Sequence, residues 1–265
     1  KEACRYFKMG ADKNDRFSMF YYGKMLFDGD GIKQNTSEGI KYIKTSADND
    51  NPKGKLEYAR ILYYGDGITA DKQKAIKYLE EAAADGNFEA MFLYGKMLIN
   101  GDGVEVDIDK GLEYIEFSCE YVNGEELFEF ASMLYKGDKI PKNKEKAAKY
   151  FQKSIDKTNN EEAKFKLAFM LKDGDGIPKD KEKSFRYFKI LSEQGNKDAM
   201  LEYSTMLIEK GQNQKEAFKY LKISADLGNV KSMLFYARLL FISITEAKRE
   251  NYQNFNETVD KIQTD

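Results

Sequence analysis

The 265-residue chain contains no histidine and no tryptophan, and it has only two cysteines and three prolines. Without histidine it lacks the side chain that titrates nearest to neutral pH, which is also the commonest protein ligand of metals. This absence excludes serine and cysteine hydrolases with a histidine base, zinc sites with histidine ligands, and haem held by a proximal histidine. We therefore expect a chain that is not an enzyme, with no catalytic residues, no metal site and no cofactor.

Charge of one sign and long apolar runs are also missing. The 43 basic and 45 acidic residues give a net charge of −2, so the chain as a whole does not attract nucleic acid or anionic lipid. No window approaches the roughly 18 uncharged apolar residues that a membrane-spanning helix needs. At 42% hydrophobic residues the chain is nevertheless too apolar to be disordered. These features predict a folded protein whose partner is another protein or a peptide segment, with no nucleic acid and no membrane insertion.

Three sequence markers recur with a period close to 36 residues. The first is a tyrosine three positions after a small residue, at Tyr6, Tyr42, Tyr78, Tyr114, Tyr150, Tyr187 and Tyr220. The second is a Gly-Asp-Gly turn that begins at Gly29, Gly65, Gly101, Gly137 and Gly174, with Lys139 in place of one second glycine. The third is an asparagine nine residues after the tyrosine, at Asn51, Asn87, Asn123, Asn159, Asn196 and Asn229. Unrelated markers that share one period indicate an internal repeat.

Each repeat has the pattern of two helices joined by a turn. In one copy Ala90, Tyr94, Met97 and Leu98 lie on one side of a helix. The large residue of this helix, Tyr94 in this copy, is followed in every copy by a small residue, which lets neighbouring helices approach closely. These small residues are Gly23, Ala59, Gly95, Ala131, Ala168, Ser204 and Ala237. The glycine turn predicts the end of this helix. The second helix then begins after a good N-cap residue at Asn35, Asp71, Asp107, Asn143 and Asp180.

These units resemble the Sel-one-like repeat, a relative of the tetratricopeptide repeat. A clear copy is Glu89–Leu98 followed by Gly101-Asp102-Gly103-Val104, and Lys74–Tyr78 with Glu81–Asn87 resembles the second helix of a unit. The resemblance covers roughly residues 1–242. It implies an all-α fold, a right-handed α/α superhelix (solenoid) of about six 36-residue helix-turn-helix repeats plus partial end units. Because one unit cannot bury its own apolar face, stability comes from stacked neighbours.

We expect residues 1–265 to form a single solenoid. Residues 1–14 are predicted as the second helix of a truncated unit and residues 229–244 as the first helix of a last unit. The full repeats are predicted at 15–50, 51–86, 87–122, 123–158, 159–195 and 196–228. Residues 245–265 are predicted as a C-terminal capping helix, with a frayed polar tail as the alternative. Because the chain opens inside a unit, we expect it to be part of something longer, such as a kinase, a ligase or an assembly protein.

Several apparent sites have simpler explanations. Asp28-Gly29-Asp30-Gly31 resembles the middle of a calcium loop, but Leu26 stands where that loop needs its first acidic ligand. Helix termination explains the glycines better.

Cys4 and Cys119 fall at apolar slots three units apart, so we expect two buried, unpaired thiols. Adjacent pairs of glutamates do not face each other on a helix, and we interpret them as solvated.

The concave groove lined by the first helices is the candidate binding site. We expect its exposed slots to lie two residues before, two residues after and five residues after the large residue of each first helix, such as Tyr94. The expected partner-binding residues are Phe20, Lys24, Phe27, Leu56, Arg60, Tyr63, Phe92, Lys96, Ile99, Phe128, Tyr135, Phe165 and Phe169. An apolar ridge beside a basic row in the first three units suits a partner segment with apolar anchors and acidic neighbours. The alternative is that the apolar row is core and the basic row merely solvated.

Three functions remain open at this point. The first, which the resemblance also implies, is a non-catalytic scaffold or adaptor that binds a partner segment in the groove. The second is a structural spacer or assembly subunit that contacts partners by its convex face or its ends. The third and least favoured is a weak hydrolase. Unpaired cysteines favour a reducing compartment, so we expect a cytoplasmic protein, with the lumen of the endoplasmic reticulum as the alternative.

Overall fold

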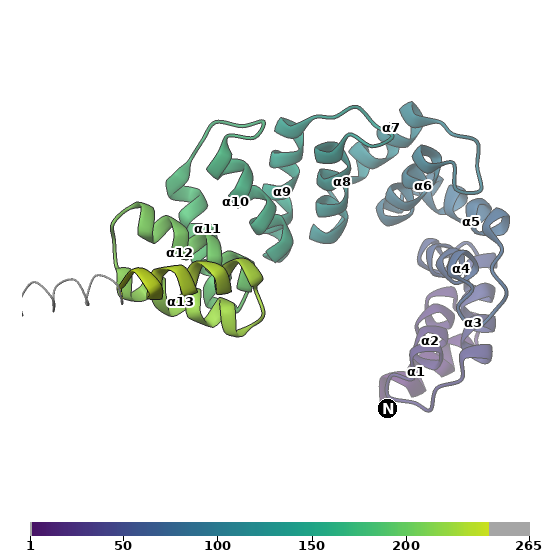
Figure 1. The fold of residues 1–265 in the computed structure, drawn as a ribbon. Helices are drawn as coiled ribbons and strands as arrows, with labels where there is room; N and C mark the ends of the chain where they lie inside the picture. Colours follow the sequence, from purple (N-terminus) through teal and green to yellow (C-terminus); the bar gives the residue numbers. More distant parts are fainter. Residues whose placement is uncertain (1, 244–265) are drawn as a thin grey trace, which may run out of the picture. The chain divides into compact units, whose positions relative to one another are not determined.

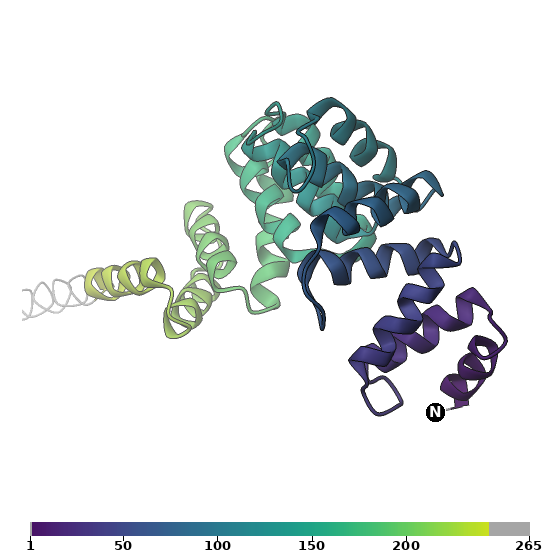
Figure 2. The same ribbon diagram turned by 90° about the vertical axis from the view of Figure 1, so that its right-hand side faces the viewer.

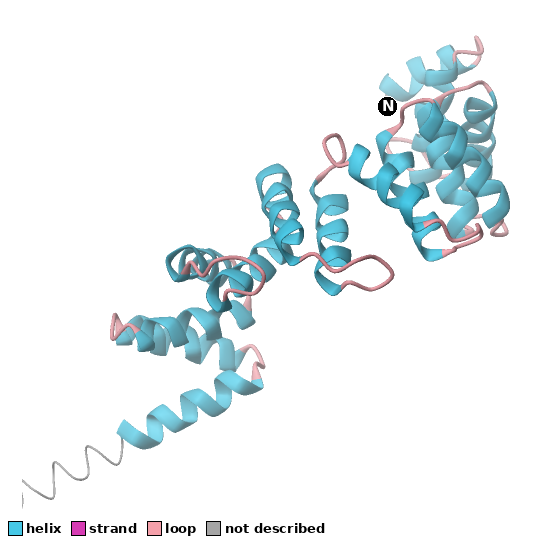
Figure 3. Ribbon diagram, turned by 90° about the horizontal axis from the view of Figure 1, so that it is seen from above, coloured by secondary structure: helices cyan, strands magenta, loops and turns pink. Residues whose placement is uncertain are grey.

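The computed structural model describes residues 2–243, and every secondary-structure element in that part of the chain is an α-helix (Figure 3). The chain divides into two compact units, Lys1–Thr158 (unit 1) and Asn159–Asp265 (unit 2). Unit 1 contains α1 (Glu2–Ala11), α2 (Arg16–Asp28), α3 (Thr36–Asp48), α4 (Pro52–Tyr64), α5 (Lys72–Ala84), α6 (Phe88–Asn100), α7 (Ile108–Ser118), α8 (Gly124–Lys136) and α9 (Lys144–Thr158). Unit 2 contains α10 (Glu161–Asp173), α11 (Lys181–Glu193), α12 (Lys197–Glu209), α13 (Gln214–Asp226) and a further helical stretch at 230–243. The prediction of an all-α repeat fold is confirmed.

The turns of the repeat end and begin helices as their residues predict. Gly29, which follows α2, has φ 76° and its N–H donates to a carbonyl four residues earlier, as in the other Gly-Asp turns. A side-chain oxygen of Asn35 or Asp71 then accepts a hydrogen bond from the backbone N–H three residues on, at 3.2 or 3.0 Å. Both ends of each loop are therefore fixed by local hydrogen bonds, and these bonds set the helix boundaries.

The recurring asparagine joins consecutive repeats. Asn51 is fully buried; its Oδ1 caps α4, while its Nδ2 donates to the carbonyl oxygen of Arg16 at 3.0 Å. Asn229 similarly caps the helical stretch at 230–243 and donates to the carboxylate of Asp198 at 2.7 Å. Each side chain thus begins one first helix and holds the start of the preceding one, which explains why an asparagine recurs at this position.

The two helices of a repeat pack as antiparallel neighbours, for example α2 with α3 and α6 with α7 (Figure 2). Glycines allow the closest approach in the third repeat, where a Cβ atom placed on Gly95 would lie 2.6 Å from the carbonyl oxygen of Gly111. Large buried residues such as Tyr58, Leu79 and Met97 fill the space around these contacts. The small slot that recurs in the sequence is therefore a helix-packing contact.

Unit 1 has two layers of helices. Figure 1 shows α2, α4 and α6 on one side of this unit and α3, α5 and α7 on the other. Neighbours within each layer are linked directly: Lys24 of α2 pairs with Glu57 of α4 at 2.6 Å, and the hydroxyl of Tyr78 donates to Asp48 of α3 at 2.7 Å. The first helices of successive repeats therefore form one continuous face of the unit.

Lys139, which replaces the second turn glycine, adopts the left-handed conformation with φ 62°. A left-handed backbone costs a residue other than glycine about 1–2 kcal/mol. We predict that Lys139→Gly raises the free energy of unfolding by about 0.5–1 kcal/mol, because glycine removes this strain but adds freedom to the unfolded chain. Urea unfolding followed by circular dichroism measures the change, and an unchanged or lower midpoint would contradict the prediction.

Both cysteines are buried and free, as predicted, with 7% of Cys4 and 1% of Cys119 exposed. Each occupies the apolar slot that the repeat register assigns to it. The predicted capping helix at 245–265 lies outside the residues that the structure describes.

Candidate protein-binding face

The predicted site residues lie on the first helices, on a surface that we call the first-helix face. In unit 1 it is formed by α2, α4, α6 and α8, and in unit 2 by α10, α12 and the stretch at 230–243. Most of the predicted slots are half-buried, with part of the side chain open to solvent: Phe20, Lys24, Phe27, Arg60, Tyr63, Lys96, Phe128, Tyr135, Phe165 and Phe169. The structure therefore leaves these ten side chains partly accessible to a partner.

Three predicted site residues are in the core instead. Leu56, Phe92 and Ile99 are 5%, 3% and 1% exposed, so the expectation that these slots are open is wrong. The physical reason is that these slots, two residues before or five after Tyr58 or Tyr94 of the first helices, lie at the border of the helix face that packs on neighbouring repeats. Whether such a border side chain is covered depends on those neighbours, which spacing along one helix does not reveal.

The basic row in unit 1 is neutralised by acidic residues of the next repeat. Besides the Lys24–Glu57 pair, Lys96 lies 2.5 Å from Glu129 of α8. Arg60 lies 3.4 Å from Glu89 of α6. These bridges run from one first helix to the next, so the row is a ladder of ion pairs within the chain. The expectation that this basic row recognises acidic residues of a partner segment does not fit the arrangement, because the cations are already paired.

Tyr63 also links repeats through its hydroxyl group. The hydroxyl donates to Asp102 in the next Gly-Asp-Gly turn, and the same carboxylate accepts a bond from Lys72 at 2.6 Å. The bond to Asp102 and burial raise the pKa of Tyr63 to about 12, so the hydroxyl stays protonated and keeps donating at neutral pH. The aspartate of the turn therefore serves inter-repeat packing in this copy, which accounts for it without a metal ion.

Unit 2 has a pocket of about 400 Å³ on the first-helix face, lined by α10, α12 and the start of the stretch at 230–243. Its apolar side consists of Phe165, Phe169 and Leu201, all half-buried. Lys197 and Lys231 line the same pocket and are exposed. Two of the predicted site residues thus come together in a hollow beside two positive charges.

Of the two acidic residues of this pocket, Glu202 is neutralised by an ion pair and Asp198 accepts a hydrogen bond from a neutral amide. Glu202 lies 2.5 Å from the ammonium group of Lys172, and Asp198 accepts the bond from Asn229 described above. Among the described residues neither Lys197 nor Lys231 makes an ion pair. The unit 2 pocket therefore combines aromatic side chains with two lysines that form no ion pair. Sequence reasoning missed Lys197 and Lys231, because they precede the slots assigned to the groove.

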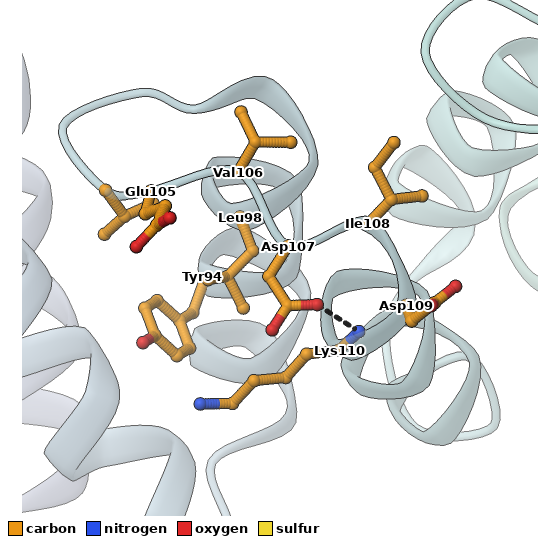
Figure 4. Close-up of a pocket in the computed structure, with 9 residues that line it drawn as sticks. Tyr94, Leu98, Glu105, Val106, Asp107, Ile108, Asp109 and Lys110 are labelled. Carbon is orange, nitrogen blue, oxygen red and sulfur yellow. Dashed lines mark hydrogen bonds between the residues drawn. The ribbon is translucent and has the colours of Figure 1, made fainter.

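A larger pocket, of about 720 Å³, lies in unit 1 between α6, the loop at 104–107 and the start of α7 (Figure 4). The Asp107 carboxylate in it accepts a bond from the backbone N–H of Lys110 at 3.0 Å and caps α7. Tyr94 lines the pocket, and burial with the nearby Glu80 carboxylate raises its pKa to about 12. The Tyr94 hydroxyl is therefore a hydrogen-bond donor at neutral pH and not a base.

The remaining candidates for chemistry are the buried cysteines and clusters of acidic side chains. Burial raises the pKa of the Cys119 thiol to about 12, which keeps it protonated and unreactive at neutral pH. Within residues 2–243 no group of three or more acidic or cysteine side chains is placed to hold a metal ion. In the same part of the chain, no helix combines the length and apolar character required to cross a lipid bilayer.

Helix-turn-helix units that are joined by inter-repeat bonds within each compact unit define an α/α repeat protein. Its sequence matches the Sel1 repeat six times, at residues 17–51, 52–87, 88–120, 127–159, 161–196 and 198–229. The chain belongs to the Sel1 repeat family, as the resemblance predicted. Comparison with curated protein sequences gives no match.

Solved structures with the same fold include other proteins with these repeats. A protective antigen of uropathogenic Escherichia coli that displays an SLR fold is 23% identical, with a TM-score of 0.74 over 90% of this chain and 52% of its own. A Sel1 repeat protein from Oxalobacter formigenes is 23% identical, with a TM-score of 0.66 over 81% of this chain and 89% of its own. The present chain thus spans about half the length of the Escherichia coli protein. At this identity the likeness concerns the fold alone.

Proposed function

We propose that this chain is a non-catalytic protein-interaction module that binds a segment of a partner protein on its first-helix face. The observation that carries the proposal is the unit 2 pocket, where Phe165, Phe169 and Leu201 lie beside two unpaired lysines. Such a hollow suits an apolar anchor side chain with an adjacent carboxylate. Proteins of the Sel1 repeat family generally mediate protein–protein interactions, which supports the same conclusion.

The unit 2 pocket is a better binding site for an acidic group of the partner than the basic row of unit 1. In unit 1 the cations are satisfied within the chain, so an acidic partner would have to displace existing bridges. In unit 2 no such bridge must be broken at Lys197 or Lys231. We therefore assign the acidic complement of the partner to the unit 2 pocket. A role as a cytoplasmic adaptor within a larger protein is part of the same proposal.

A peptide library selected on the intact chain tests this function. We expect the enriched peptides to carry a large apolar residue next to aspartate or glutamate. Reversing the two pocket charges with Lys197→Glu and Lys231→Glu should weaken the selected peptides about 10-fold or more, because two favourable charge interactions become repulsive. Fluorescence anisotropy of a labelled selected peptide measures the dissociation constant.

The matched control is Lys215→Glu with Lys219→Glu on the exposed side of α13, which makes the same change in net charge away from the pocket. We expect this variant to bind as tightly as the original chain. Equal weakening by both variants would show that only overall charge matters. Peptides that lose no affinity on the pocket variant would favour the alternative, a spacer or assembly subunit contacted at its other faces or its ends.

A further inference from the structure

An exposed aromatic cluster lies where α7 ends, beside the start of α6. Phe117 and Tyr121 expose 62% and 63% of their surface, and the ring of Tyr121 stacks on Phe88 with the centroids 3.7 Å apart. The centroid of the Phe117 ring lies 6.2 Å from the centroid of the Phe88 ring. We call these three residues the α7 cluster. Large apolar side chains gathered in the open usually mark an interaction surface.

The other repeats show that the fold does not need aromatic residues there. The first repeat has Thr45 where the third has Phe117, and the second has Glu81. Polar residues also replace Tyr121, with Asn49 in the first repeat. The second helices of those repeats, α3 and α5, form without aromatic residues at these positions and are each 13 residues long, against 11 for α7. The α7 cluster is therefore not a requirement of the repeat architecture.

Three other exposed rings of unit 1 are covered by a cation of the chain, whereas the exposed Tyr64 packs edge-on against Tyr63. Arg5 lies over Tyr6, Arg16 over Phe17 and Lys53 over Tyr21, each between 5.1 and 5.7 Å from the ring centroid. Within the described residues no lysine or arginine lies over a ring of the α7 cluster. A positively charged side chain is attracted to the face of an aromatic ring. The cluster thus offers this interaction to an external cation.

Helix α7 and the loop before it carry an excess of acidic residues. Residues 105–121 contain six acidic residues and one lysine, whereas the corresponding residues 141–157 of the next repeat contain six lysines and two acidic residues. Glu116 and Glu120 are paired with lysines of α9 at 2.5 Å. Asp109 and Glu113 make no ion pair among the described residues. The exposed face of α7 therefore carries negative charge that the chain does not neutralise.

Both free acids and one of the aromatic rings lie along one side of α7. Asp109, Glu113 and Phe117 follow each other at intervals of four residues within the helix, and Tyr121 lies in the turn after its end; all four side chains are exposed. Residues four apart on a helix are neighbours on its surface. Asp109 also lines the larger pocket at the start of α7, together with Glu105, Val106 and Lys110 (Figure 4). The two free acids and Phe117, with Tyr121 beyond the end of the helix, thus form one strip of exposed side chains.

We propose that this strip of α7 binds a basic segment of a partner protein. Arginine or lysine side chains of that segment lie over the rings of the α7 cluster, and others pair with Asp109 and Glu113. The helix is about 16 Å long, so an extended segment of about five residues covers it. The strip belongs to unit 1 and the second-helix layer, and it uses none of the residues of the unit 2 pocket. It is therefore a second binding surface of opposite charge preference.

A labelled peptide of alternating arginine and serine, about eight residues long, is the probe for this surface. Fluorescence anisotropy with the full chain at low ionic strength measures its dissociation constant. Reversing the free charges with Asp109→Lys and Glu113→Lys should weaken binding about 10-fold or more. Installing the first-repeat residues with Phe117→Thr and Tyr121→Asn should weaken it about 5-fold, because cation–π contacts are lost while every charge stays.

Asp30→Lys with Asp66→Lys is the charge-matched control, since both residues are exposed in turns of earlier repeats. This variant and the unit 2 pocket variant should bind the probe as the original chain does. Circular dichroism confirms that each variant is folded. The proposal is overturned if the original chain does not bind the probe, if either α7 variant binds it unchanged, or if the control loses as much affinity as the charge-reversal variant.

Discussion

Replacing Phe92 by alanine should lower the free energy of unfolding by about 3–5 kcal/mol, the usual cost of emptying a phenylalanine site in a core. Phe92 is only 3% exposed, although its slot belongs to a row that elsewhere is partly open. The truncation removes most of the buried side chain and leaves a cavity that the rigid repeat cannot fill completely. Urea unfolding followed by circular dichroism measures the loss.

Phe92→Leu is the matched control, because leucine occupies the same slot at Leu56 and Leu201. We expect this variant to lose no more than about 1.5 kcal/mol, since most of the apolar volume is kept. Lys96→Ala, which removes a partly exposed ion pair with Glu129, should cost less than about 1 kcal/mol. An alanine variant at Phe92 as stable as the original chain would show that this side chain is a surface residue after all.

Replacing Gly95 by alanine should also destabilise the chain, by about 2 kcal/mol, although alanine normally favours a helix over glycine by about 1 kcal/mol. The new methyl group would meet the carbonyl oxygen of Gly111 at 2.6 Å, and that oxygen is part of a packed helix and not a flexible side chain. Helices α6 and α7 must therefore separate, which weakens the contacts around them. Thermal and urea unfolding both report the change.

The second repeat provides the control for this substitution. Ala59 occupies the slot of Gly95, and Ala75 occupies that of Gly111, so this helix pair already accommodates a methyl group on each side. Ala59→Gly should destabilise by about 1 kcal/mol, mainly through helix propensity. If Gly95→Ala instead stabilises the chain, the close approach of α6 and α7 is not the constraint that the structure shows.

The helices and their ends could be predicted from the sequence because local interactions decide them. Gly29 ends α2 because its positive φ costs glycine little, and Asn35 begins α3 because its side chain accepts a backbone hydrogen bond. The same local chemistry appears in nearly every repeat, so a period near 36 residues was visible without coordinates. The burial of Cys4 and Cys119 followed from the repeat register for the same reason.

The candidate site was only partly predictable. Phe165 and Phe169 were assigned to the first-helix face, and both line the unit 2 pocket. The two lysines of that pocket were missed, because the pocket depends on how α12 meets the stretch at 230–243. The pairing of Lys24 and Lys96 could not be predicted, since their acidic partners are about 33 residues away in the chain. No pattern along a single helix reveals a bridge between two repeats.

The sequence by itself determined that this protein is a Sel1 repeat chain of paired helices, with its turns, caps and buried thiols in place. Those features rest on interactions within a few residues of one another, which spacing and residue type disclose. Only the tertiary structure decided that Leu56, Phe92 and Ile99 are core, that the basic row is paired, and where hollows open on each unit. Burial and ion pairing are properties of neighbours in space, and in a repeat protein those neighbours come from the adjoining repeat.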